Sequence, residues 1–350
     1  MKKLRVGVVG ASFGGVIHVP AFRAQGRFDV VAIASPNRAA EVARARKIPA
    51  AFASLDDMLA ATQLDVLSIA TPPYEHRAAV LAALERGLHV LCEKPFGLNV
   101  AQAEEMCAAA ERAGTVCALA HEFRYTPARR ALHELVTNAH LGPLRAIEAT
   151  RFDAFLGADV ERPKTWWFER RRGGGISGAI LSHLIDEANW LAGRRPLRAT
   201  GYERTAVVER HAGGERFRSD VADGAFATID YGEGIIATVT ADATRAVESS
   251  MLAVHGARRT AVASGDNMLD VTTFVVDADE TAELQLAPQA HPNLATAHPN
   301  LPPFVTLLDA FAAAIDGAAI DGSLADVPTF ADGLATQRVL EAVGYSITAA

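Results

Sequence analysis

The sequence predicts an α/β Rossmann domain followed by an α+β domain with a large, mainly antiparallel sheet. Up to about residue 122, short apolar runs alternate with helix-like segments, and a glycine-rich turn follows the first run. Beyond it, strand-like runs follow one another, several with no helix between them. Buried strands joined by helices form a parallel, doubly wound sheet, and strands joined by short loops form an antiparallel one. At 350 residues the chain has room for two domains, which we place at residues 1–122 and 123–350.

The composition and charge of the chain argue against several classes of protein. With 34 Lys and Arg against 41 Asp and Glu, the net charge is −7, and nucleic-acid-binding proteins usually carry a basic face instead. The longest stretch without a charged residue, Leu284–Leu308, contains five prolines and does not fit a membrane helix. The N-terminal MKKLRVGVVG lacks the apolar core of a signal peptide, and Cys92, Cys107 and Cys117 have no CxxC spacing. We therefore expect a cytoplasmic protein with reduced cysteines, no metal site, and neither a nucleic acid nor a membrane as partner.

In the first domain, the apolar runs predict five strands, and glycines mark the helix ends. Residues 75–86 form a helix that stops at Gly87, and a second helix runs from the N-cap Asn99 to Gly114, with Gln102 in the capping-box position. Both glycines suit the left-handed position that follows a helix. The predicted strands are Leu4–Val9, Val30–Ala34, Asp65–Ala70, Leu88–Cys92 and Thr115–Ala120.

In the second domain, the pattern predicts strands that pair with their neighbours. Tyr231–Gly234 has the composition of a hairpin loop, and Leu286–Pro303 is a long proline-rich connection. The predicted strands are Leu144–Phe152, Ala199–Arg210, Asp223–Asp230 and Ile235–Ala241, with further strand-like runs up to Leu286. The predicted helices are Ile180–Leu191, Pro303–Ile315 and Phe330–Ile347.

The segment Gly10–Gly15 follows a strand and opens a helix, which is the context of a dinucleotide-binding turn. Gly10 can make the tight turn, and Gly15 permits close packing of helix on strand. Ser12 and Phe13 complete the loop, with Ser12 where glycine usually lets the backbone approach the pyrophosphate. Such turns also occur for packing alone, but the further strands favour cofactor binding.

The end of the second strand bears on the choice between NAD and NADP. No carboxylate stands about 20 residues after the glycine turn, where NAD enzymes usually hold the ribose hydroxyls. Ser35, Asn37 and Arg38 stand there instead and could hold a 2′-phosphate, so we expect NADP to be preferred over NAD. The alternative is that Arg38 is a solvated residue at a helix start.

The tripeptide Glu93-Lys94-Pro95 follows a buried strand, and open parallel sheets bind ligands at that edge. At this point the chain resembles the Gfo/Idh/MocA family of nicotinamide-dependent oxidoreductases. The order and spacing of the matching motifs agree over nearly the whole chain. They are the glycine loop with His18, Ala70-Thr71-Pro72-Pro73 with His76, Glu93-Lys94-Pro95, Arg124-Tyr125-Thr126-Pro127, Gly173-Gly174-Gly175, His183 with Asp186, and Thr329-Phe330-Ala331-Asp332-Gly333.

The resemblance implies a Rossmann domain and a C-terminal sheet domain that binds substrate and buries its open face against another copy. The chemistry it implies is reversible hydride transfer on sugars, polyols or related hydroxy and keto compounds. Thr71, Pro72 and His76 would then line the cofactor cleft, and Glu93 and Lys94 would lie beside the nicotinamide ribose. A homodimer or homotetramer is expected. The plain alternative for Lys94 is a surface lysine that starts a loop.

His183 is the candidate base. It is three residues before Asp186, so the two share a helix face. Oxidation of an alcohol requires a base for the hydroxyl proton, and histidine suits this role at neutral pH. By the resemblance His183 takes it, while Lys94 polarises the reacting oxygen. Inositol dehydrogenase-type members have an aspartate four residues before this histidine, where the chain has Ala179. The alternative is a helix histidine packed at a domain interface.

Four further residues are candidates for substrate contact. His121 and Arg124 follow the last Rossmann strand, and Arg124 could anchor an anionic or hydroxyl-rich substrate or only bridge the domains. Trp166 and Trp167 precede the glycine run and could form pocket walls or core packing.

We therefore expect an oxidoreductase that uses NADP, or NAD, to act on CH–OH groups of a small-molecule substrate. The alternative is a non-catalytic NAD(P)-binding sensor on the same fold, which the loss of a carboxylate at Ala179 would favour. A third possibility is a catalyst of elimination, or of imine or enone reduction, that uses the same residues.

Overall fold

The computed structural model describes residues 2–267, 271–317 and 327–347, which divide into two compact units. The first unit contains residues 1–97, 101–125 and 289–333, and the second contains residues 98–100, 126–288 and 334–350. The sequence-based division places everything after residue 122 in the second domain. The observed units differ from it because residues 289–333 pack with the N-terminal strands.

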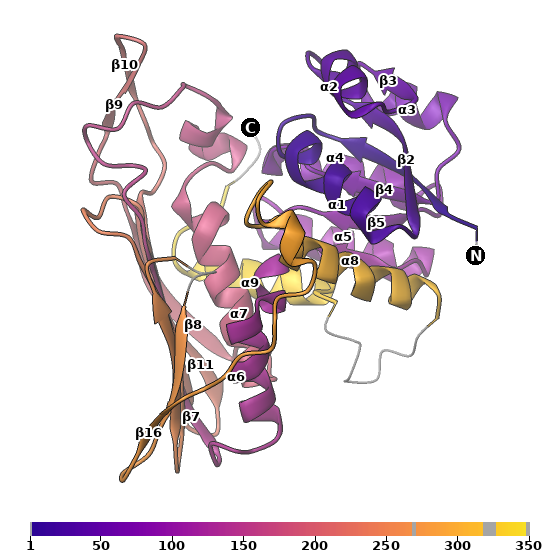
Figure 1. Cartoon of the computed structure of the whole chain (residues 1–350). Helices are drawn as coiled ribbons and strands as arrows, with labels where there is room; N and C mark the ends of the chain where they lie inside the picture. Colours follow the sequence, from indigo (N-terminus) through magenta and orange to yellow (C-terminus); the bar gives the residue numbers. More distant parts are fainter. Residues whose placement is uncertain (1, 268–270, 318–326, 348–350) are drawn as a thin grey trace. The chain divides into compact units, whose positions relative to one another are not determined.

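The first unit is built on a parallel sheet of six strands in the order β3-β2-β1-β4-β5-β6 (Figure 1). This confirms the predicted doubly wound sheet. The strand of three residues, Ala50–Phe52, was not predicted, because it is too short to give a pattern. The strands are β1 (Leu4–Val9), β2 (Phe28–Ala34), β3 (Ala50–Phe52), β4 (Val66–Ile69), β5 (His89–Cys92) and β6 (Cys117–Leu119).

Helices cover both faces of this sheet. Gly87 and Gly114 have φ of 68° and 65° after the ends of two of these helices, as predicted. A π-helical turn, η1 (Gly14–His18), precedes the first α-helix, and a 3₁₀ turn, η2 (Glu122–Tyr125), follows β6. The helices are α1 (Val19–Gln25), α2 (Ala39–Arg46), α3 (Leu55–Ala61), α4 (Pro73–Leu84), α5 (Val100–Ala113) and α8 (Leu301–Ile315).

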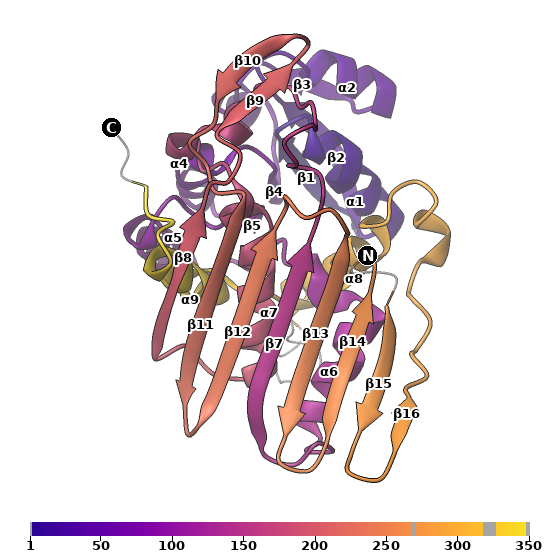
Figure 2. The ribbon, with the colours of Figure 1, turned by 90° about the vertical axis from the view of Figure 1, so that its left-hand side faces the viewer.

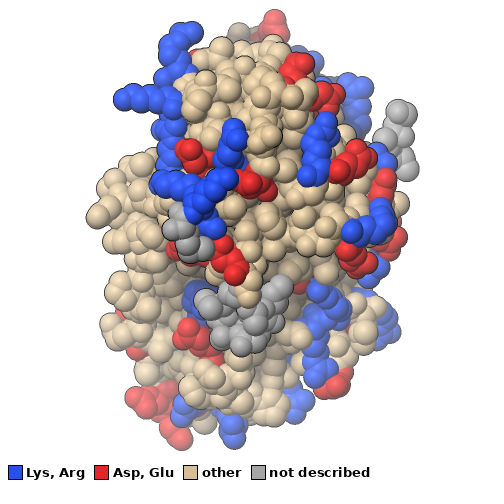
Figure 3. All heavy atoms as spheres, turned by 90° about the vertical axis from the view of Figure 1, so that its right-hand side faces the viewer, with Lys and Arg blue, Asp and Glu red and all other residues tan. Residues whose placement is uncertain are grey.

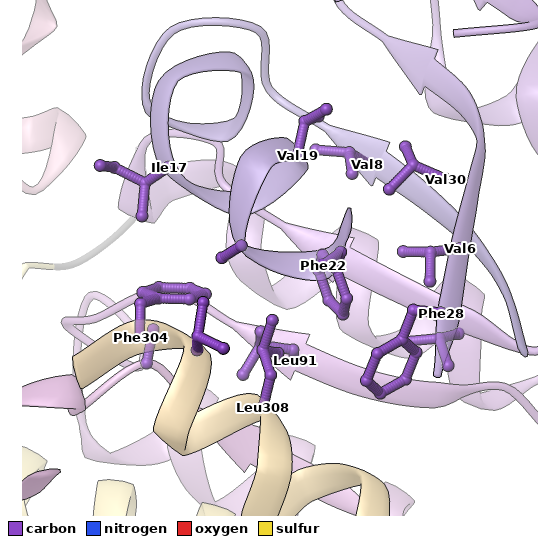
Figure 4. Close-up of a cluster of buried hydrophobic side chains, with 14 of the residues drawn as sticks. Val6, Val8, Ile17, Val19, Phe22, Phe28, Val30, Leu91, Phe304 and Leu308 are labelled. Atoms are coloured by element: carbon purple, nitrogen blue, oxygen red, sulfur yellow. The ribbon is translucent and has the colours of Figure 1, made fainter. Parts of the chain in front are cut away.

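The core of the first unit includes α8, although α8 lies almost 200 residues after the last Rossmann strand. The rings of Phe22 on α1 and Phe28 on β2 meet edge to face at 4.9 Å, and Phe311 of α8 stacks on Phe28 at 6.1 Å. Figure 4 shows Phe304 and Leu308 of α8 in one cluster with Phe22, Phe28 and Leu91 of β5. The proline-rich connection before α8, with the 3₁₀ turn η6 (Pro292–Leu294), therefore leads the chain back to the first unit.

The second unit is built on a sheet of eight strands in the order β16-β15-β14-β13-β7-β12-β11-β8 (Figure 2). Only β12 and β7 are parallel, so the predicted mainly antiparallel sheet is confirmed. The prediction of a single strand over Ala199–Arg210 is wrong, because the strand ends at Arg204 and Arg210 belongs to a separate two-stranded ribbon. The strands are β7 (Leu144–Phe152), β8 (Arg198–Arg204), β9 (Glu209–Ala212), β10 (Glu215–Arg218), β11 (Gly224–Gly232), β12 (Ile235–Asp242), β13 (Ser249–Gly256), β14 (Thr260–Gly265), β15 (Thr272–Val276) and β16 (Thr281–Glu283).

Two helices of the second unit pack on one face of this sheet. They are α6 (Pro127–Thr137), which was not predicted, and α7 (Ser182–Ala192), which follows the π-helical turn η5 (Ser177–Leu181). Within the described part of this unit, no helix covers the face that Figure 2 presents, where Tyr202 is 70% exposed and Phe226 is 44% exposed. The last helix, α9 (Phe330–Ala342), ends five residues before the predicted Ile347.

Surface charges of both signs are intermingled. In the first unit, Arg27 pairs with Asp316 and Arg77 pairs with Glu105. Figure 3 shows basic and acidic side chains next to one another on the face that it presents. None of the helices within residues 2–267, 271–317 and 327–347 has the length and apolarity that a membrane crossing requires.

Candidate functional site

The glycine turn at the end of β1 leaves no room for a side chain. Gly10 has a φ of 101°, and a Cβ atom there would lie 2.2 Å from the carbonyl oxygen of Ala70. A Cβ atom on Gly14 would lie 2.9 Å from Cγ1 of Val8 on β1. The predicted role of Gly15 in packing helix on strand is therefore wrong, because that position belongs to Gly14, while Gly15 faces Val42 of α2. The contacts of Gly10 with Ala70 and of Gly14 with Val8 hold the glycine loop and the start of the first helix against the sheet.

The predicted 2′-phosphate residues lie at the end of β2. Asn37 and Arg38 are exposed, and Nη1 of Arg38 is 3.5 Å from the hydroxyl of Ser12 in the glycine loop. The carboxylate of Glu41, a residue that the sequence did not point to, accepts hydrogen bonds of 3.3 Å from Nε and Nη2 of Arg38. The hydrogen bond and charge of Arg38 hold the pKa of Glu41 below its usual value. Ser35 is partly buried and donates its backbone N–H to Phe52.

A chain of buried hydrogen bonds crosses three elements below the ends of the strands. The hydroxyl of Ser68 on β4 is 2.7 Å from Nδ1 of His18, and Nε2 of His18 is 3.0 Å from Oε1 of Glu93. The other carboxylate oxygen of Glu93 accepts the backbone N–H of Lys94 at 3.2 Å. Ser68 and His18 are fully buried, and Glu93 is 7% exposed.

The surroundings of Glu93 decide its charge. Burial alone raises the pKa of its carboxyl, but the hydrogen bond and charge of His18, with the charges of Lys94 and His76, hold the pKa below the usual value. Glu93 is therefore ionised at neutral pH and accepts hydrogen bonds only, so Nε2 of His18 carries a hydrogen. In the neutral form of His18, Nδ1 then accepts a hydrogen bond from Ser68.

His76 joins the loops that follow β4 and β5. Its Nε2 atom is 2.9 Å from the carbonyl oxygen of Thr71, and its Nδ1 atom is 3.0 Å from the carbonyl oxygen of Pro95. The peptide bond between Lys94 and Pro95 is cis. Burial lowers the pKa of His76, and the two carbonyl groups and Glu93 act in the opposite direction. A neutral imidazole has one N–H and donates to one of these carbonyl oxygens at a time.

The ends of β4 and β5 carry the other predicted cofactor residues. Pro72 is the N-cap of α4, and the buried Oγ1 atom of Thr71 has no hydrogen-bond partner within the described residues. Lys94 is half-buried at the end of β5, next to the end of β4 in the sheet. Burial raises the pKa of the Cys92 thiol well above its usual value, so this cysteine stays protonated. The structure thus brings Gly10, Thr71 and Lys94 to one edge of one sheet.

Two predicted substrate residues lie at η2, also in the first unit: Arg124 is part of this turn, and His121 directly precedes it. His121 and Arg124 are 1% and 4% exposed. Nη2 of Arg124 is 3.8 Å from a carboxylate oxygen of Asp332, and the same oxygen accepts hydrogen bonds from the backbone N–H and hydroxyl of Thr329. Residue 329 also bridges to β6 through Ala118. Arg124 therefore helps to hold the Thr329–Gly333 segment at the edge of the sheet.

In the second unit, the glycine run leads into the helix of His183. A Cβ atom on Gly174 would lie 2.1 Å from the carbonyl oxygen of Trp167, so only glycine fits there. The helical structure begins at Ser177, two residues after the run. The phenol of Tyr345 donates to the carbonyl oxygen of Gly173 at 3.0 Å, which ties the C-terminal segment to this turn.

The helix α7 carries a row of buried polar side chains. His183, Asp186 and Glu187 are each 2% exposed or less. Ala179 lies one turn before His183 in η5 and has no carboxylate with which to orient the imidazole. Burial raises the pKa of Tyr231, which donates to Asn189 at 2.8 Å, and the charge of Asp186 adds to this effect.

Two charged residues that the sequence did not point to form an ion pair at the helix of His183. Nε of Arg129 on α6 is 2.6 Å from Oε1 of Glu187, and both side chains are at most 2% exposed. Glu187 stands four residues after His183, a helical spacing that could have drawn attention to it. Arg129 gave no such signal, because its helix was not predicted.

The two adjacent tryptophans, Trp166 and Trp167, have different surroundings. The ring of Trp167 lies 6.3 Å from Phe155 and 5.3 Å from Phe168, and the guanidinium of Arg162 lies 5.4 Å from its centroid. Trp167 is therefore a packing residue. The side chain of Trp166 is half-buried and, within the described residues, has no ring, cation or hydrogen-bond partner. Trp166 and His183 lie in the second unit, and Lys94, His121 and Arg124 lie in the first.

Comparison with known proteins identifies the family. Residues 4–121 match the model of the Gfo/Idh/MocA oxidoreductase family with its NAD-binding Rossmann fold, and residues 129–262 match the model of a C-terminal domain of the same family. The 1,5-anhydro-D-fructose reductase of Ensifer adhaerens is 29% identical over 89% of this chain and 88% of its own. Levoglucosan dehydrogenase of Pseudarthrobacter phenanthrenivorans is 28% identical over 69% of this chain and 68% of its own.

Other matches vary in extent. The matched part of the curated relatives spans from 43% to 88% of their own length. The crystal structure of an oxidoreductase domain protein from Kribbella flavida is 26% identical, with a TM-score of 0.83 over 98% of this chain and 96% of that one. Two family models that together match most of the sequence, in the expected order, settle the assignment: the chain belongs to the Gfo/Idh/MocA family of oxidoreductases, with an NAD-binding Rossmann domain at its N-terminal side.

Proposed function

We propose that this protein is an NAD(P)-dependent oxidoreductase that transfers hydride between the nicotinamide and a sugar, a polyol or a related hydroxy or keto compound. The observation that carries the proposal is the meeting of Gly10, Thr71 and Lys94 at the carboxyl edge of β1, β4 and β5. In open parallel sheets this edge is where dinucleotides bind. The names of two relatives, a 1,5-anhydro-D-fructose reductase and a levoglucosan dehydrogenase, support a sugar-like substrate.

The residues at the sheet edge fit a dinucleotide. Gly10 admits no Cβ atom, so the loop turns tightly against Ala70 at the end of β4, and Ser12 and Phe13 are exposed where we place the pyrophosphate. The buried hydroxyl of Thr71, unpaired within the described residues, is available to a ligand. The cofactor supplies or accepts the hydride. Residues that would hold it are Gly10, Ser12, Phe13, Gly15, Ser35, Asn37, Arg38, Thr71, Pro72, His76, Glu93 and Lys94.

We assign the proton and orientation chemistry to residues of both units. Lys94 holds the nicotinamide ribose and polarises the reacting oxygen, and His183 accepts or donates the proton of the substrate hydroxyl. His121, Arg124 and Trp166 contact the substrate, and the unpaired ring of Trp166 suits the apolar face of a sugar. NADP is preferred, because the guanidinium of Arg38 lies beside the glycine loop, no carboxylate follows β2 directly, and the exposed ion pair of Arg38 with Glu41 is weak enough for a 2′-phosphate to replace it.

A second candidate function is a non-catalytic NAD(P)-binding sensor. One observation favours it: Ala179 stands one turn before His183 and cannot orient the imidazole as a carboxylate would. In either case we propose a cytoplasmic homodimer or homotetramer. The uncovered face of the eight-stranded sheet, with Tyr202, Phe226 and Ile236 exposed, suits burial against another copy.

Binding and turnover test the two candidates. NADH and NADPH are titrated by the fluorescence of the reduced nicotinamide, and a panel of sugars, anhydro sugars and polyols is then followed by nicotinamide absorbance. The oxidoreductase binds the reduced cofactors and reduces or oxidises members of the panel. Binding without turnover of any polyol or keto compound favours the sensor, and binding of neither cofactor refutes both functions.

A further inference from the structure

The hydrogen-bond chain Ser68–His18–Glu93 ends on the backbone of Lys94. One carboxylate oxygen of Glu93 is 3.0 Å from Nε2 of His18, and the other accepts the N–H of Lys94 at 3.2 Å. Both oxygens of Glu93 therefore have partners within the first unit. The hydrogen bonds of this carboxylate hold His18 and the backbone of Lys94 together, so it can act on a ligand through Lys94.

The imidazole of His18 is held from several sides. Ser68 fixes Nδ1 at 2.7 Å, the ring of Phe13 meets it edge to face at 5.8 Å, and the ring of Phe304 on α8 lies 4.7 Å away. His18 is fully buried, so no solvent competes for its hydrogen bonds. Its rotamer, and with it the position of the Glu93 carboxylate, is thus set by packing as well as by hydrogen bonds.

His18 also lies at a junction between two segments. It is the last residue of η1, the turn that follows the glycine loop, and Glu93 is 75 residues later at the end of β5. In a bound dinucleotide, the central pyrophosphate would contact the first segment, and the nicotinamide half would contact the second. One buried side chain therefore connects the loop of Gly10 to the turn of Lys94.

We infer that His18 is a positioning residue for the nicotinamide end of the cofactor: through Glu93 it fixes the backbone of Lys94, while Ser68 fixes His18. The inference rests on the proposed function, because it assigns Lys94 to the nicotinamide end. Glu93 then links His18 to Lys94 through its two carboxylate oxygens. Loss of His18 leaves the pyrophosphate-binding loop intact and removes one support of the Lys94 turn.

The test compares two ligands that share one end. ADP has the adenosine and the pyrophosphate, and NADH adds the second ribose and the nicotinamide ring that we assign to Lys94. Both are titrated by calorimetry into the full chain and into the variants His18→Gln, Glu93→Gln and Ser68→Ala. We expect His18→Gln to weaken NADH binding about tenfold or more, the range for losing hydrogen bonds to a charged group, and ADP binding by less than about twofold.

His89→Gln is the matched control. His89 lies at the other end of β5, where its Nδ1 atom accepts the backbone N–H of Val116 at 3.0 Å. Its substitution removes a comparable hydrogen bond from the same strand, away from the binding edge. We expect it to lower the unfolding temperature and to leave the ratio of NADH to ADP affinity unchanged.

The outcomes separate the inference from the proposed function. If the parent protein binds neither ligand, the proposed function fails and the inference fails with it. If the parent binds both, and His18→Gln changes neither affinity or weakens both equally, the inference alone is overturned. If His18→Gln does not fold, Ser68→Ala decides, because it removes the hydrogen bond that fixes His18; an unchanged ratio of the two affinities in a folded Ser68→Ala then overturns the inference.

Discussion

The guanidinium of Arg129 meets the carboxylate of Glu187 at 2.6 Å, one helical turn after His183, with both side chains at most 2% exposed. Two charges removed from water are stable only as a pair, so the loss of either leaves an uncompensated charge in the interior. The pair joins α6 to the helix that carries His183. It therefore fixes one side of that helix.

Arg129→Met should destabilise the fold by ~3–5 kcal/mol, because the Glu187 carboxylate loses its buried partner. The double variant Arg129→Met with Glu187→Leu should recover much of this loss, since apolar side chains replace both charges. Urea unfolding followed by circular dichroism measures the difference. A single variant as stable as the parent would show that the pair is solvated in solution.

The pH dependence of stability should report the buried imidazole of His76. Burial lowers its pKa, with the carbonyl groups of Thr71 and Pro95 and the charge of Glu93 opposing this. The unfolded chain takes up the proton near the usual value of about 6.5, and the folded chain takes it up only at lower pH. Stability therefore falls as the pH drops below about 6.5. His76→Gln has no proton to take up, so between pH 7 and pH 5 its unfolding temperature should fall less than that of the parent. Parallel curves would contradict this assignment.

Cofactor preference should depend on Arg38. Its Nη1 atom lies 3.5 Å from Ser12 in the glycine loop, so a 2′-phosphate in this place would meet a guanidinium. NADPH should bind tighter than NADH, and Arg38→Ala should reduce the difference. Glu41→Gln should increase NADPH affinity by no more than about fivefold, since exposed ion pairs are weak. Arg44→Ala, on the same helix and also exposed, serves as the control. Tighter binding of NADH by the parent protein would refute the preference.

Assembly should depend on the uncovered face of the eight-stranded sheet. Tyr202 and Phe226 are paired in register on β8 and β11, with their rings 5.5 Å apart and exposed. Light scattering should give a mass that is a multiple of 37.1 kDa. Phe226→Glu should shift it toward the monomer by placing a charge in an apolar contact. Val247→Glu is the control, because Val247 is 74% exposed outside the strands. A monomeric parent protein at micromolar concentration would exclude this face as an interface.

The sequence predicted the parts of the first unit whose signals are local. The run Leu4–Val9 and the glycine at position 10 lie next to each other, and their pattern needs no information from the rest of the chain. The strand Ala50–Phe52 was missed because three residues cannot show a period. The apolar pattern of α8 predicted a buried helix but not its partner, and the structure packs Phe304 and Phe311 into the first unit.

Long-range pairs were the part of the candidate site that the sequence could not show. His18 and Glu93 both belong to recognised motifs, but their contact joins residues 75 positions apart and depends on strand order. Arg129 was missed because its helix was not predicted, and Glu187 because a buried ion pair has no local pattern. Gly15 was given the wrong neighbour because spacing alone does not show which glycine faces β1; the helix after the loop starts with a π-helical turn, and Gly14 faces Val8 there.

The assignment of Lys94 and His183 can be tested once a substrate has been found. Lys94 stands at the end of β5 at the predicted nicotinamide edge, and His183 is a buried base on α7. Lys94→Met should slow hydride transfer by removing the charge that polarises the reacting oxygen, while ADP binding stays unchanged. His183→Ala should lower turnover by roughly 10²–10⁴, the usual effect of losing a general acid or base. Ala179→Asp should raise alcohol oxidation if the missing carboxylate limits the basicity of His183.

Single-turnover measurement of cofactor reduction separates the chemical step in these variants from product release. Asn138→Ala, a change at the C-cap of α6, serves as a control for small effects on the fold of the second unit. In an enzyme, the single-turnover rate falls in both Lys94→Met and His183→Ala and is kept in the control. A sensor shows no turnover in the parent, and the same substitutions change only its ligand response. Hydride transfer at the parent rate in both variants would contradict the catalytic assignment, because neither the charge nor the base would then take part in the reaction.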